Sequence, residues 1–143
     1  MRWIFTLLLY SLIPLQPAWG SDITLRIGTH NIQAVIANTP HSREQGLMQH
    51  SRLCDNCGML FVFPKTGKYS FWMKDTPLPL SIAFIASNGS ILEITEMQAN
   101  TLDIHGARVK FIYALEMPKN WFSKHRLSAK DRVEGLQQAP AGQ

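Results

Sequence analysis

The sequence predicts an all-β protein: a mainly antiparallel sandwich or barrel-like sheet with one or two short helices. Short segments of strand character recur along the chain. Turn residues such as Asn, Gly and Pro separate them, and only two brief segments carry helix signals. The chain has 143 residues, of which 45% are hydrophobic and 17% charged. This composition fits one globular domain and excludes wholesale disorder.

The first part of the predicted domain contains three strands and a helix. Ile23–Ile27 and Asn31–Ala37 alternate apolar and polar residues, as half-buried strands do. Asn38-Thr39-Pro40 supplies a helix cap followed by proline, which predicts a helix from Pro40 to about Met48. Met59–Phe63 is apolar throughout, so we expect this strand in the middle of the fold with both faces covered.

The middle of the chain reads as further strands separated by turns. Pro64–Gly67 is a turn by composition, and Tyr69–Met73 is expected to be a strand. The two prolines of Asp75–Pro79 exclude a central strand there. Ser81–Ala86 and its partner Ile91–Thr95 are expected to form a hairpin, because Asn88-Gly89 lies between them.

The last long strand is expected from about residue 109 to residue 117, where Pro118 ends it. Alternate residues of this segment are apolar and should share one face: Val109, Phe111, Tyr113, Leu115 and Met117. Asn120–His125 is expected to form a helical turn, followed by a short strand around Val133. Residues 137–143 read as a frayed tail.

Residues 1–20 have the features of a secretory signal peptide. Arg2 precedes an apolar run from Trp3 to Leu15, which is shorter than the ~20 residues that a membrane-spanning helix needs. Ala18-Trp19-Gly20 then offers small residues around a cleavage site. We therefore expect cleavage near Gly20 and a single β domain over residues 21–143. That domain should be periplasmic or secreted, without stable membrane insertion.

The charge distribution gives little support for a nucleic-acid partner. The formal net charge is +4, and basic residues gather only near the end, at Lys119, Lys124, Arg126, Lys130 and Arg132. Asp131 and Glu134 dilute this group. Nucleic-acid binders usually show a basic face together with a recognisable motif, so we expect a solvated surface and no nucleic acid.

The central segment resembles a known family. The resemblance rests on Gly46-Leu-Met48, Gly58-Met-Leu-Phe-Val-Phe-Pro64, Ser70-Phe-Trp-Met-Lys74, Thr76 and Pro79-Leu80. In these motifs the chain is similar to the domain of unknown function family 192, over about residues 22–136. The resemblance implies a compact, mainly antiparallel β domain that is often exported or attached to an envelope, and no established reaction. Asp75 and Ser81 depart from the family pattern, which has Asn and Asp at these places.

The two cysteines have three interpretations. Cys54 and Cys57 in an oxidising compartment favour a disulfide, and a loop this small contributes little entropic stabilisation. A redox-active pair usually needs a helix N-terminus to lower a thiol pKa, whereas this pair precedes a strand. The third interpretation is copper handling, because soft or borderline ligands gather here: Met48, His50, Cys54, Cys57 and Met59.

A candidate ligand site follows in the Tyr69–Met73 strand. Alternation places Ser70, Trp72 and Lys74 on one face, continuing into Asp75 and Thr76. A flat indole beside a few polar groups is a common way to hold a small ligand. The alternative is that Trp72 packs under a loop with its N–H bonded to the backbone.

No catalytic constellation is found in the sequence. Gly-x-Ser-x-Gly, His-Glu-x-x-His and glycine-rich phosphate loops are missing. The sequence therefore favours an exported, non-catalytic protein that binds a small ligand or an envelope component without a cofactor, and it leaves an enzymatic role open. The alternatives are a thiol-redox or copper-handling periplasmic protein and a structural envelope protein without a pocket.

Overall fold

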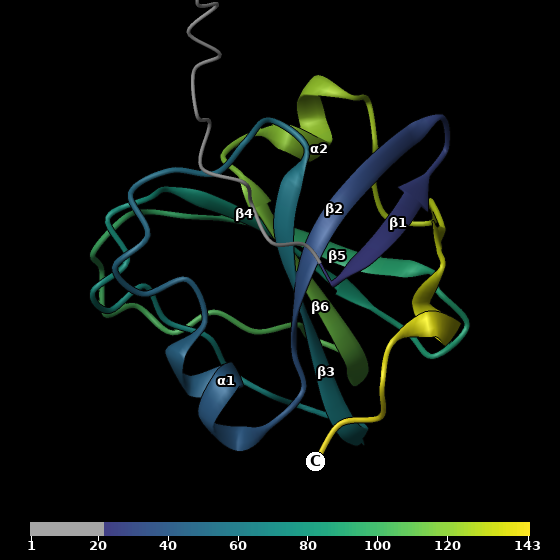
Figure 1. Ribbon diagram of the computed structural model, residues 1–143, viewed down its shortest axis with the longest axis horizontal. Coiled ribbons are helices and arrows are strands. Elements are labelled where there is room, and N and C mark those ends of the chain that lie inside the picture. Colours follow the sequence, from purple (N-terminus) through teal and green to yellow (C-terminus); the bar gives the residue numbers. More distant parts are fainter. Residues whose placement is uncertain (1–21) are drawn as a thin grey trace, which may run out of the picture.

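The computed structural model describes residues 22–143, in which seven strands form one sheet curled into a half-barrel (Figure 1). The strands are β1 (Ile23–Ile27), β2 (His30–Ala37), β3 (Cys57–Gly67), β4 (Leu80–Ile85), β5 (Ile91–Met97), β6 (Phe111–Pro118) and β7 (Val133–Glu134). Two short helices, α1 (Pro40–Gln45) and α2 (Trp121–Lys124), and a 3₁₀ turn η1 (Leu136–Gln138) complete the described part. The predicted all-β fold class is confirmed. The predicted signal peptide and its cleavage site lie outside the described residues.

The strand order is β5-β4-β6-β3-β2-β1-β7, and the pairing is antiparallel except between β2 and β3. The β2–β3 pair is parallel because α1 and the loop after it carry the chain back before β3 begins. The central strands β3, β4 and β6 are apolar at most positions, and both of their faces are covered. The expectation for Met59–Phe63 is therefore confirmed.

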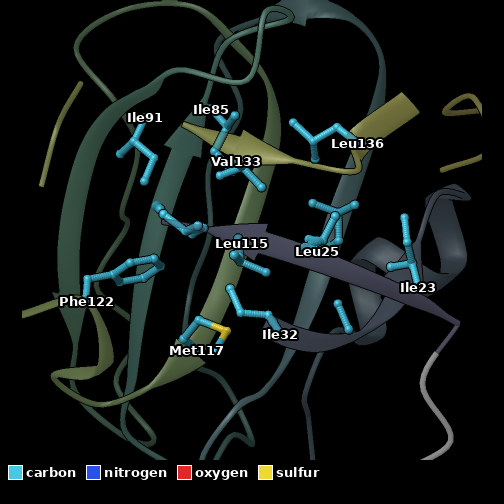
Figure 2. Close-up of a cluster of buried hydrophobic side chains, with 14 of the residues drawn as sticks. Ile23, Leu25, Ile32, Ile85, Ile91, Leu115, Met117, Phe122, Val133 and Leu136 are labelled. Atoms are coloured by element: carbon cyan, nitrogen blue, oxygen red, sulfur yellow. The ribbon is translucent and has the colours of Figure 1, made fainter. Parts of the chain in front are cut away.

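One face of the sheet carries the first core cluster (Figure 2). Its side chains come from β1, β2, alternate positions of the central strands, the start of β5, α2, β7 and η1. They are Ile23, Leu25, Ile27, Ile32, Ala34, Leu60, Val62, Ala83, Ile85, Ile91, Leu115, Met117, Trp121, Phe122, Val133 and Leu136. This cluster contains the buried positions of β1, whose alternation of buried and exposed residues follows the predicted pattern.

The opposite face carries the second core cluster. It consists of Ala37, Leu47, Met59, Phe61, Phe63, Phe71, Met73, Leu80, Ile82, Phe84, Met97, Phe111 and Ala114. The aromatic rings pack edge to face, for example Phe61 against Phe71 with ring centroids 5.0 Å apart. Residues 46–48 and the segment from Phe71 to Met73 cover this face, so that it too is buried.

Helix α1 begins at the predicted cap. The Thr39 hydroxyl accepts a hydrogen bond from the Ser42 N–H at 3.1 Å, and the Ser42 hydroxyl accepts one from the Thr39 N–H at 3.0 Å. The helix ends at Gln45, before Gly46, rather than at Met48. In Figure 1 it lies at the lower left of the sheet, away from α2.

The Asn88-Gly89 hairpin is confirmed and also helps to close the sheet. Gly89 has φ +88° and its N–H donates to the Ala86 carbonyl. Its carbonyl accepts from the Val133 N–H at 2.8 Å, and the Ile91 N–H donates to Asp131 at 2.9 Å. The start of β5 thus meets β7, so the two edge strands of the sheet touch at one corner.

Three local predictions were wrong. Residues 64–67, expected as a turn, form the end of β3 beyond a register irregularity, where Pro64 needs no ladder hydrogen bond. Tyr69–Met73 is not a strand: only Phe71 forms a bridge, to His105, because residues 98–110 form no strand that could pair with it. Strand β6 begins at Phe111, and the same irregularity turns Phe111 into the second core cluster, away from Leu115.

The C-terminal segment is held to α1 and its cap, where the sequence predicts a frayed tail. The Gln143 N–H donates to the Asn38 carbonyl at 2.7 Å, and the Asn38 side chain donates to Ala141 at 3.1 Å. Arg43 donates to the Gln143 carbonyl at 2.7 Å. This segment therefore borders the helix that forms one wall of the site described below.

None of the helices in residues 22–143 has the length and apolar character needed to cross a bilayer.

Candidate functional site

A pocket of about 200 Å³ opens on the second core cluster, between α1 and the segment from Ser70 to Thr76. Its lining combines α1, the turn after it, β3, the 70–76 segment and one residue of β6. The lining residues are Arg43, Glu44, Gln45, Gly46, Leu47, Met48, Phe61, Phe63, Ser70, Phe71, Trp72, Met73, Thr76 and Glu116. Four aromatic rings and two methionines share this lining with polar side chains, and Glu116 is the one buried carboxyl among them.

Glu116 supplies that carboxyl from the middle of the sheet. It pairs with Met59 on β3 and with Ile82 on β4, so its side chain belongs to the face of the second core cluster. The residue is only 4% exposed. Among residues 22–143 no hydrogen bond or ion pair reaches its carboxyl group. Burial raises the pKa of Glu116 from an ordinary 4.5 to about 8, because a charged carboxylate loses its hydration here.

Trp72 stands at the rim of the pocket. Phe71 and Met73 are buried while Trp72 is 43% exposed, so the predicted alternation of sides holds although this segment is no strand. The Lys74 ammonium lies over the Trp72 ring, 5.3 Å from its centroid. Of the predicted ligand residues, Ser70, Trp72 and Thr76 line the pocket, and Lys74 adjoins it through the indole.

Asp75 and Thr76 form a turn that supports the rim. Asp75 has φ +52°, a conformation that Asn and Asp tolerate better than most residues, and its carbonyl accepts from the Gln49 N–H at 2.7 Å. The Thr76 hydroxyl donates to the Lys74 carbonyl at 3.0 Å, and the residue is buried. Asp75 does not line the pocket, and its backbone joins the 70–76 segment to the turn after α1.

Arg43 fixes the wall formed by α1. Its guanidinium donates to the carbonyls of Asn38 and Val62 at 2.8 and 3.0 Å, in addition to Gln143. It also lies over the Phe63 ring, 5.2 Å from the centroid. The Arg43 guanidinium is therefore held by backbone carbonyl oxygens.

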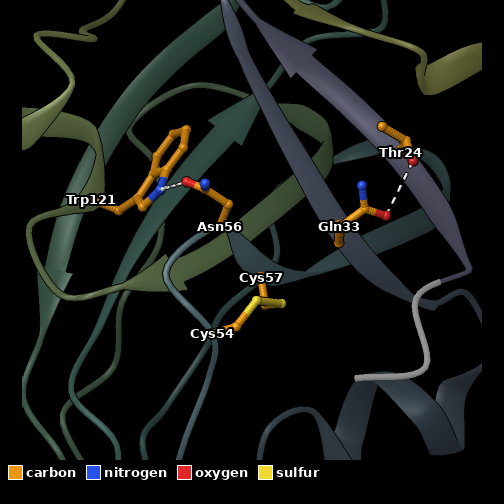
Figure 3. Close-up of a disulfide and its surroundings, with 6 residues drawn as sticks. All are labelled: Thr24, Gln33, Cys54, Asn56, Cys57 and Trp121. Carbon is orange, nitrogen blue, oxygen red and sulfur yellow. Dashed lines mark hydrogen bonds between the residues drawn. A yellow bond between two sulfur atoms is a disulfide. The ribbon is translucent and has the colours of Figure 1, made fainter. Parts of the chain in front are cut away.

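The cysteines form a disulfide between Cys54 and Cys57 (Figure 3). The loop is anchored from both sides, since the Asn56 side chain accepts from the Trp121 indole N–H at 3.1 Å and its carbonyl accepts from the Gln33 N–H at 2.9 Å. Cys57 is buried at the start of β3 and Cys54 is exposed. The predicted disulfide is confirmed.

The five residues of the copper interpretation are divided between different surroundings. Met48 lines the pocket, Met59 is buried on β3, and the His50 ring nitrogen lies 3.1 Å from the Met48 carbonyl. Within a disulfide, Cys54 and Cys57 offer no thiolate. In the part of the chain that the structure describes, no three His, Cys, Asp or Glu side chains gather in a metal-binding arrangement.

The place of Ser81, where the family pattern has Asp, still has a carboxylate beside it. The buried Ser81 hydroxyl donates to Glu96 at 2.6–2.7 Å, and the Asn120 N–H donates to both Ser81 and Glu96. Glu96 lies opposite Ser81 on the neighbouring strand β5. A carboxylate of the adjacent strand thus lies beside the Ser81 hydroxyl.

The candidate site residue that the sequence analysis missed is Glu116. Its signal is a single acid inside the apolar run Tyr113-Ala-Leu-Glu-Met117, in a strand that the structure buries on both faces over residues 114–117. An acid in such a run is worth noting, because Glu is almost never fully buried without a partner.

A second hollow, of about 390 Å³, lies beside the disulfide loop. It is lined by Asp55, Asn56, Pro118, Lys119, Trp121, Lys124 and His125. The His125 ring packs against the rings of Trp121 and His30, with centroids 4.4 and 4.3 Å away. Its lining includes two lysines beside the Trp121 and His125 rings, whereas the pocket at Glu116 has an acid among several aromatic rings.

Comparison with known proteins gives one family and two similar structures. Residues 23–135 match the DUF192 family, described as "Uncharacterized ACR". A solved structure from Sinorhizobium meliloti 1021, described as a candidate transcription regulator, is 33% identical, with TM-score 0.77, covering 80% of this chain and 93% of that chain.

A protein of unknown function from Novosphingobium aromaticivorans DSM 12444 is 25% identical, also with TM-score 0.77, covering 83% of this chain and 89% of that one. No curated protein matches the sequence. The family match spans all seven strands of the sheet, and it also contains the 70–76 segment. The chain therefore belongs to the DUF192 family.

Proposed function

We propose that this protein is an exported, non-catalytic binding protein that takes one small molecule into the pocket above Glu116. The observation that carries the proposal is the carboxyl of Glu116, buried without a partner at the base of a pocket lined by aromatic rings. A buried polar group without a partner costs about 1–3 kcal/mol. A ligand that satisfies this group would recover part of that cost on binding.

The size of the pocket limits the ligand to a small molecule. An engineered cavity of about 150 Å³ in another protein holds benzene. A pocket of about 200 Å³ is therefore suited to a molecule of one ring or a few more atoms. Nucleotides and oligosaccharides are too large to enter it fully.

The proposal is tested by a thermal-shift and calorimetric screen of single-ring and similarly small compounds. For a compound that binds, Trp72→Ala should weaken affinity roughly fivefold or more, because the indole contributes rim contact area. Leu102→Ala is the matched control: Leu102 is an exposed apolar residue, 65% accessible, that does not line the pocket. Affinity that survives Trp72→Ala and Glu116→Gln unchanged would place the binding elsewhere.

Export is part of the proposal and has its own test. The support is the basic start, short apolar run and Ala18-Trp19-Gly20 site in the sequence. Intact mass measurement of the protein recovered from the cell envelope or medium should give a chain beginning at Ser21. A chain that keeps Met1 and stays in the cytoplasm would contradict export.

A second candidate function is thiol exchange or copper handling at the disulfide. The observation in its favour is that Cys54 is exposed in a loop whose residues Asp55 and Asn56 also line the second hollow. A reduction potential below about −300 mV marks a structural bridge. A markedly higher potential, or stoichiometric copper on the reduced protein, would favour this candidate over the pocket.

Nucleic acid is not among the proposed partners, although the Sinorhizobium protein is described as a candidate transcription regulator. The basic residues near the end of this chain are interspersed with acids: Asp131 accepts a hydrogen bond from Ser128, and Glu134 pairs with Arg26. A DNA mobility shift at physiological salt should therefore be negative.

A further inference from the structure

We infer that the ligand of the pocket is a small organic cation, an ammonium compound whose charge is held by the Glu116 carboxylate and whose apolar part packs on Phe61, Phe71 and Trp72. This inference rests on the proposed function of the same pocket and names the chemical class of its ligand. It is carried by the arrangement of one acid among aromatic rings.

The acid determines the sign of the charge that the pocket accepts. The Glu116 carboxyl is 4% exposed and has no hydrogen bond or ion pair from residues 22–143. In such surroundings an attractive charge acts far more strongly than in water. A cationic ligand supplies the missing partner, whereas an anionic ligand would meet a carboxylate or force it to stay protonated.

The rings favour a cation of organic type over a metal ion. Ammonium groups are attracted to the faces of Trp, Phe and Tyr rings within about 6 Å. The Trp72 ring already carries the Lys74 ammonium at 5.3 Å from its centroid. Metal ions need several oxygen, nitrogen or sulfur donors, and no such cluster is found in the described part of the chain.

The other charged groups near Glu116 are compatible with this ligand. On α1, Arg43 is engaged by the carbonyls of Asn38, Val62 and Gln143, and Glu44 adds a second negative charge to the pocket lining. On the 70–76 segment, Lys74 is held by Trp72 and does not line the pocket. From β3 and β4 the neighbours Met59 and Ile82 are apolar.

Binding of a cation has a proton balance that can be measured. Because burial raises the pKa of Glu116 to about 8, the empty pocket holds mostly the protonated acid at neutral pH. The ammonium ion binds the carboxylate, so the acid releases its proton to solvent: one acid and one cation give one ion pair and one proton. Affinity should then rise up to tenfold per pH unit from about pH 6 to about pH 8 and level off above.

The test compares three probes of nearly equal shape on the full chain by calorimetry. They are choline, which is a permanent cation; dimethylbutanol, in which carbon replaces the nitrogen; and dimethylbutanoate, an anion. At about pH 8 choline should bind at least about tenfold more tightly than the alcohol, and the anion should bind most weakly. Affinity for the alcohol should not rise with pH.

Glu116→Gln removes the charge and keeps the shape. It should weaken choline at least about tenfold and abolish its pH dependence, while affinity for the alcohol changes less than about twofold. Asp103→Asn is the matched control, since Asp103 is an exposed acid that does not line the pocket, and it should change choline affinity less than about twofold. If Glu116→Gln does not fold, two measurements on the unmodified protein still test the inference. They are the ratio of its affinities for choline and the alcohol, and the pH dependence of its affinity for choline.

The outcomes separate this inference from the proposed function. If the alcohol binds as well as choline, or if Glu116→Gln binds choline normally, the cation assignment is overturned while the pocket remains a binding site. If none of the three probes binds at millimolar concentration, the cation assignment falls, and the screen of neutral single-ring compounds decides the pocket function by itself.

Discussion

The Glu116 carboxyl lies in surroundings that favour its neutral form, because the second core cluster excludes water and offers no cation or hydrogen-bond donor to it within residues 22–143. Its proton affinity therefore differs between the folded and unfolded chain. In the folded protein its pKa is about 8, against 4.5 ordinarily. Protein stability must depend on pH through this one residue.

The first prediction concerns that pH dependence. A raised folded-state pKa means that the folded chain binds more protons than the unfolded chain between pH 4.5 and about 8. Its stabilising contribution is complete below pH 4.5 and is lost as the pH rises to about 8, at up to about 1.4 kcal/mol per pH unit. Urea unfolding of the unmodified protein should show this decline.

Glu116→Gln provides the comparison, since the amide does not titrate. Its free energy of unfolding should stay nearly flat over the same pH range and should exceed that of the unmodified protein at about pH 8. Glu44→Gln should keep the decline. Parallel pH profiles for Glu116→Gln and the unmodified protein would show that Glu116 ionises normally.

At the scale of elements, strands β3 and β6 approach each other closely where the pocket floor is built. A Cβ atom on Gly58 would lie 2.3 Å from the Glu116 carbonyl oxygen and 2.5 Å from the Met117 sulfur. The first of these neighbours is backbone and cannot rotate away. Gly58 therefore sets the spacing of the two strands that carry Met59 and Glu116.

The second prediction follows from this contact. Gly58→Ala should lower the free energy of unfolding by about 2–3 kcal/mol, because the added methyl group forces the strands apart. Urea or thermal unfolding measures the loss. Met117→Leu in the same background should not restore stability, since the clash with the carbonyl remains. An unchanged stability of Gly58→Ala would contradict the close approach.

The third prediction concerns the wall formed by α1 and the C-terminal segment. Deletion of residues 141–143 removes the hydrogen bonds that link this segment to Asn38 and Arg43. Three such bonds are lost and each contributes about 0.5–1.5 kcal/mol, so the free energy of unfolding should fall by about 1.5–4.5 kcal/mol. Gln137→Ala, in the exposed part of η1, should change it by less than about 0.5 kcal/mol. Equal stability of the deletion variant would show that the segment is not held.

At the scale of the whole molecule, stability comes from two apolar clusters on opposite faces of one curled sheet. Neither cysteine belongs to these two core clusters. The disulfide joins residues separated by only 3 positions in the sequence, so it closes a very short loop. Hydrogen bonds from Trp121 and Gln33 to Asn56 hold the same loop independently. The bridge is therefore an addition to a fold that is already specified.

The fourth prediction tests this. In the chain-entropy account, a bridge over so short a loop contributes at most about 2 kcal/mol. The double variant Cys54→Ser/Cys57→Ser should lose no more than this and should keep the near-ultraviolet circular dichroism of the unmodified protein. Loss of the folded state would show that the bridge is essential.

Much of the fold could be predicted from the sequence because its signals are local. The alternation in Ile23–Ile27, the cap at Thr39 and the Asn88-Gly89 hairpin each depend on a few neighbouring residues. The strand predicted at Tyr69–Met73 was wrong because strand formation does not depend on local residues alone. Strand formation needs a partner, and the segment opposite offers only His105 as a bridge.

The candidate site was predicted only in part. Trp72 and Ser70 were found because alternation puts them outside the core, and this holds in the structure. Lys74 and Asp75 were included by adjacency and do not line the pocket. Glu116 was missed because it lies 44 residues beyond Trp72, and only the folded chain brings both residues to the lining of one pocket.

The sequence by itself determined the all-β class, the family, most turns and which residues of each strand are apolar, since these follow from residue type and short-range geometry. Only the tertiary structure decided that α1, the 70–76 segment and β6 enclose one pocket around an acid. The physical reason is that the pKa of Glu116 and the shape of the pocket depend on burial. That burial is created by segments far apart in the chain.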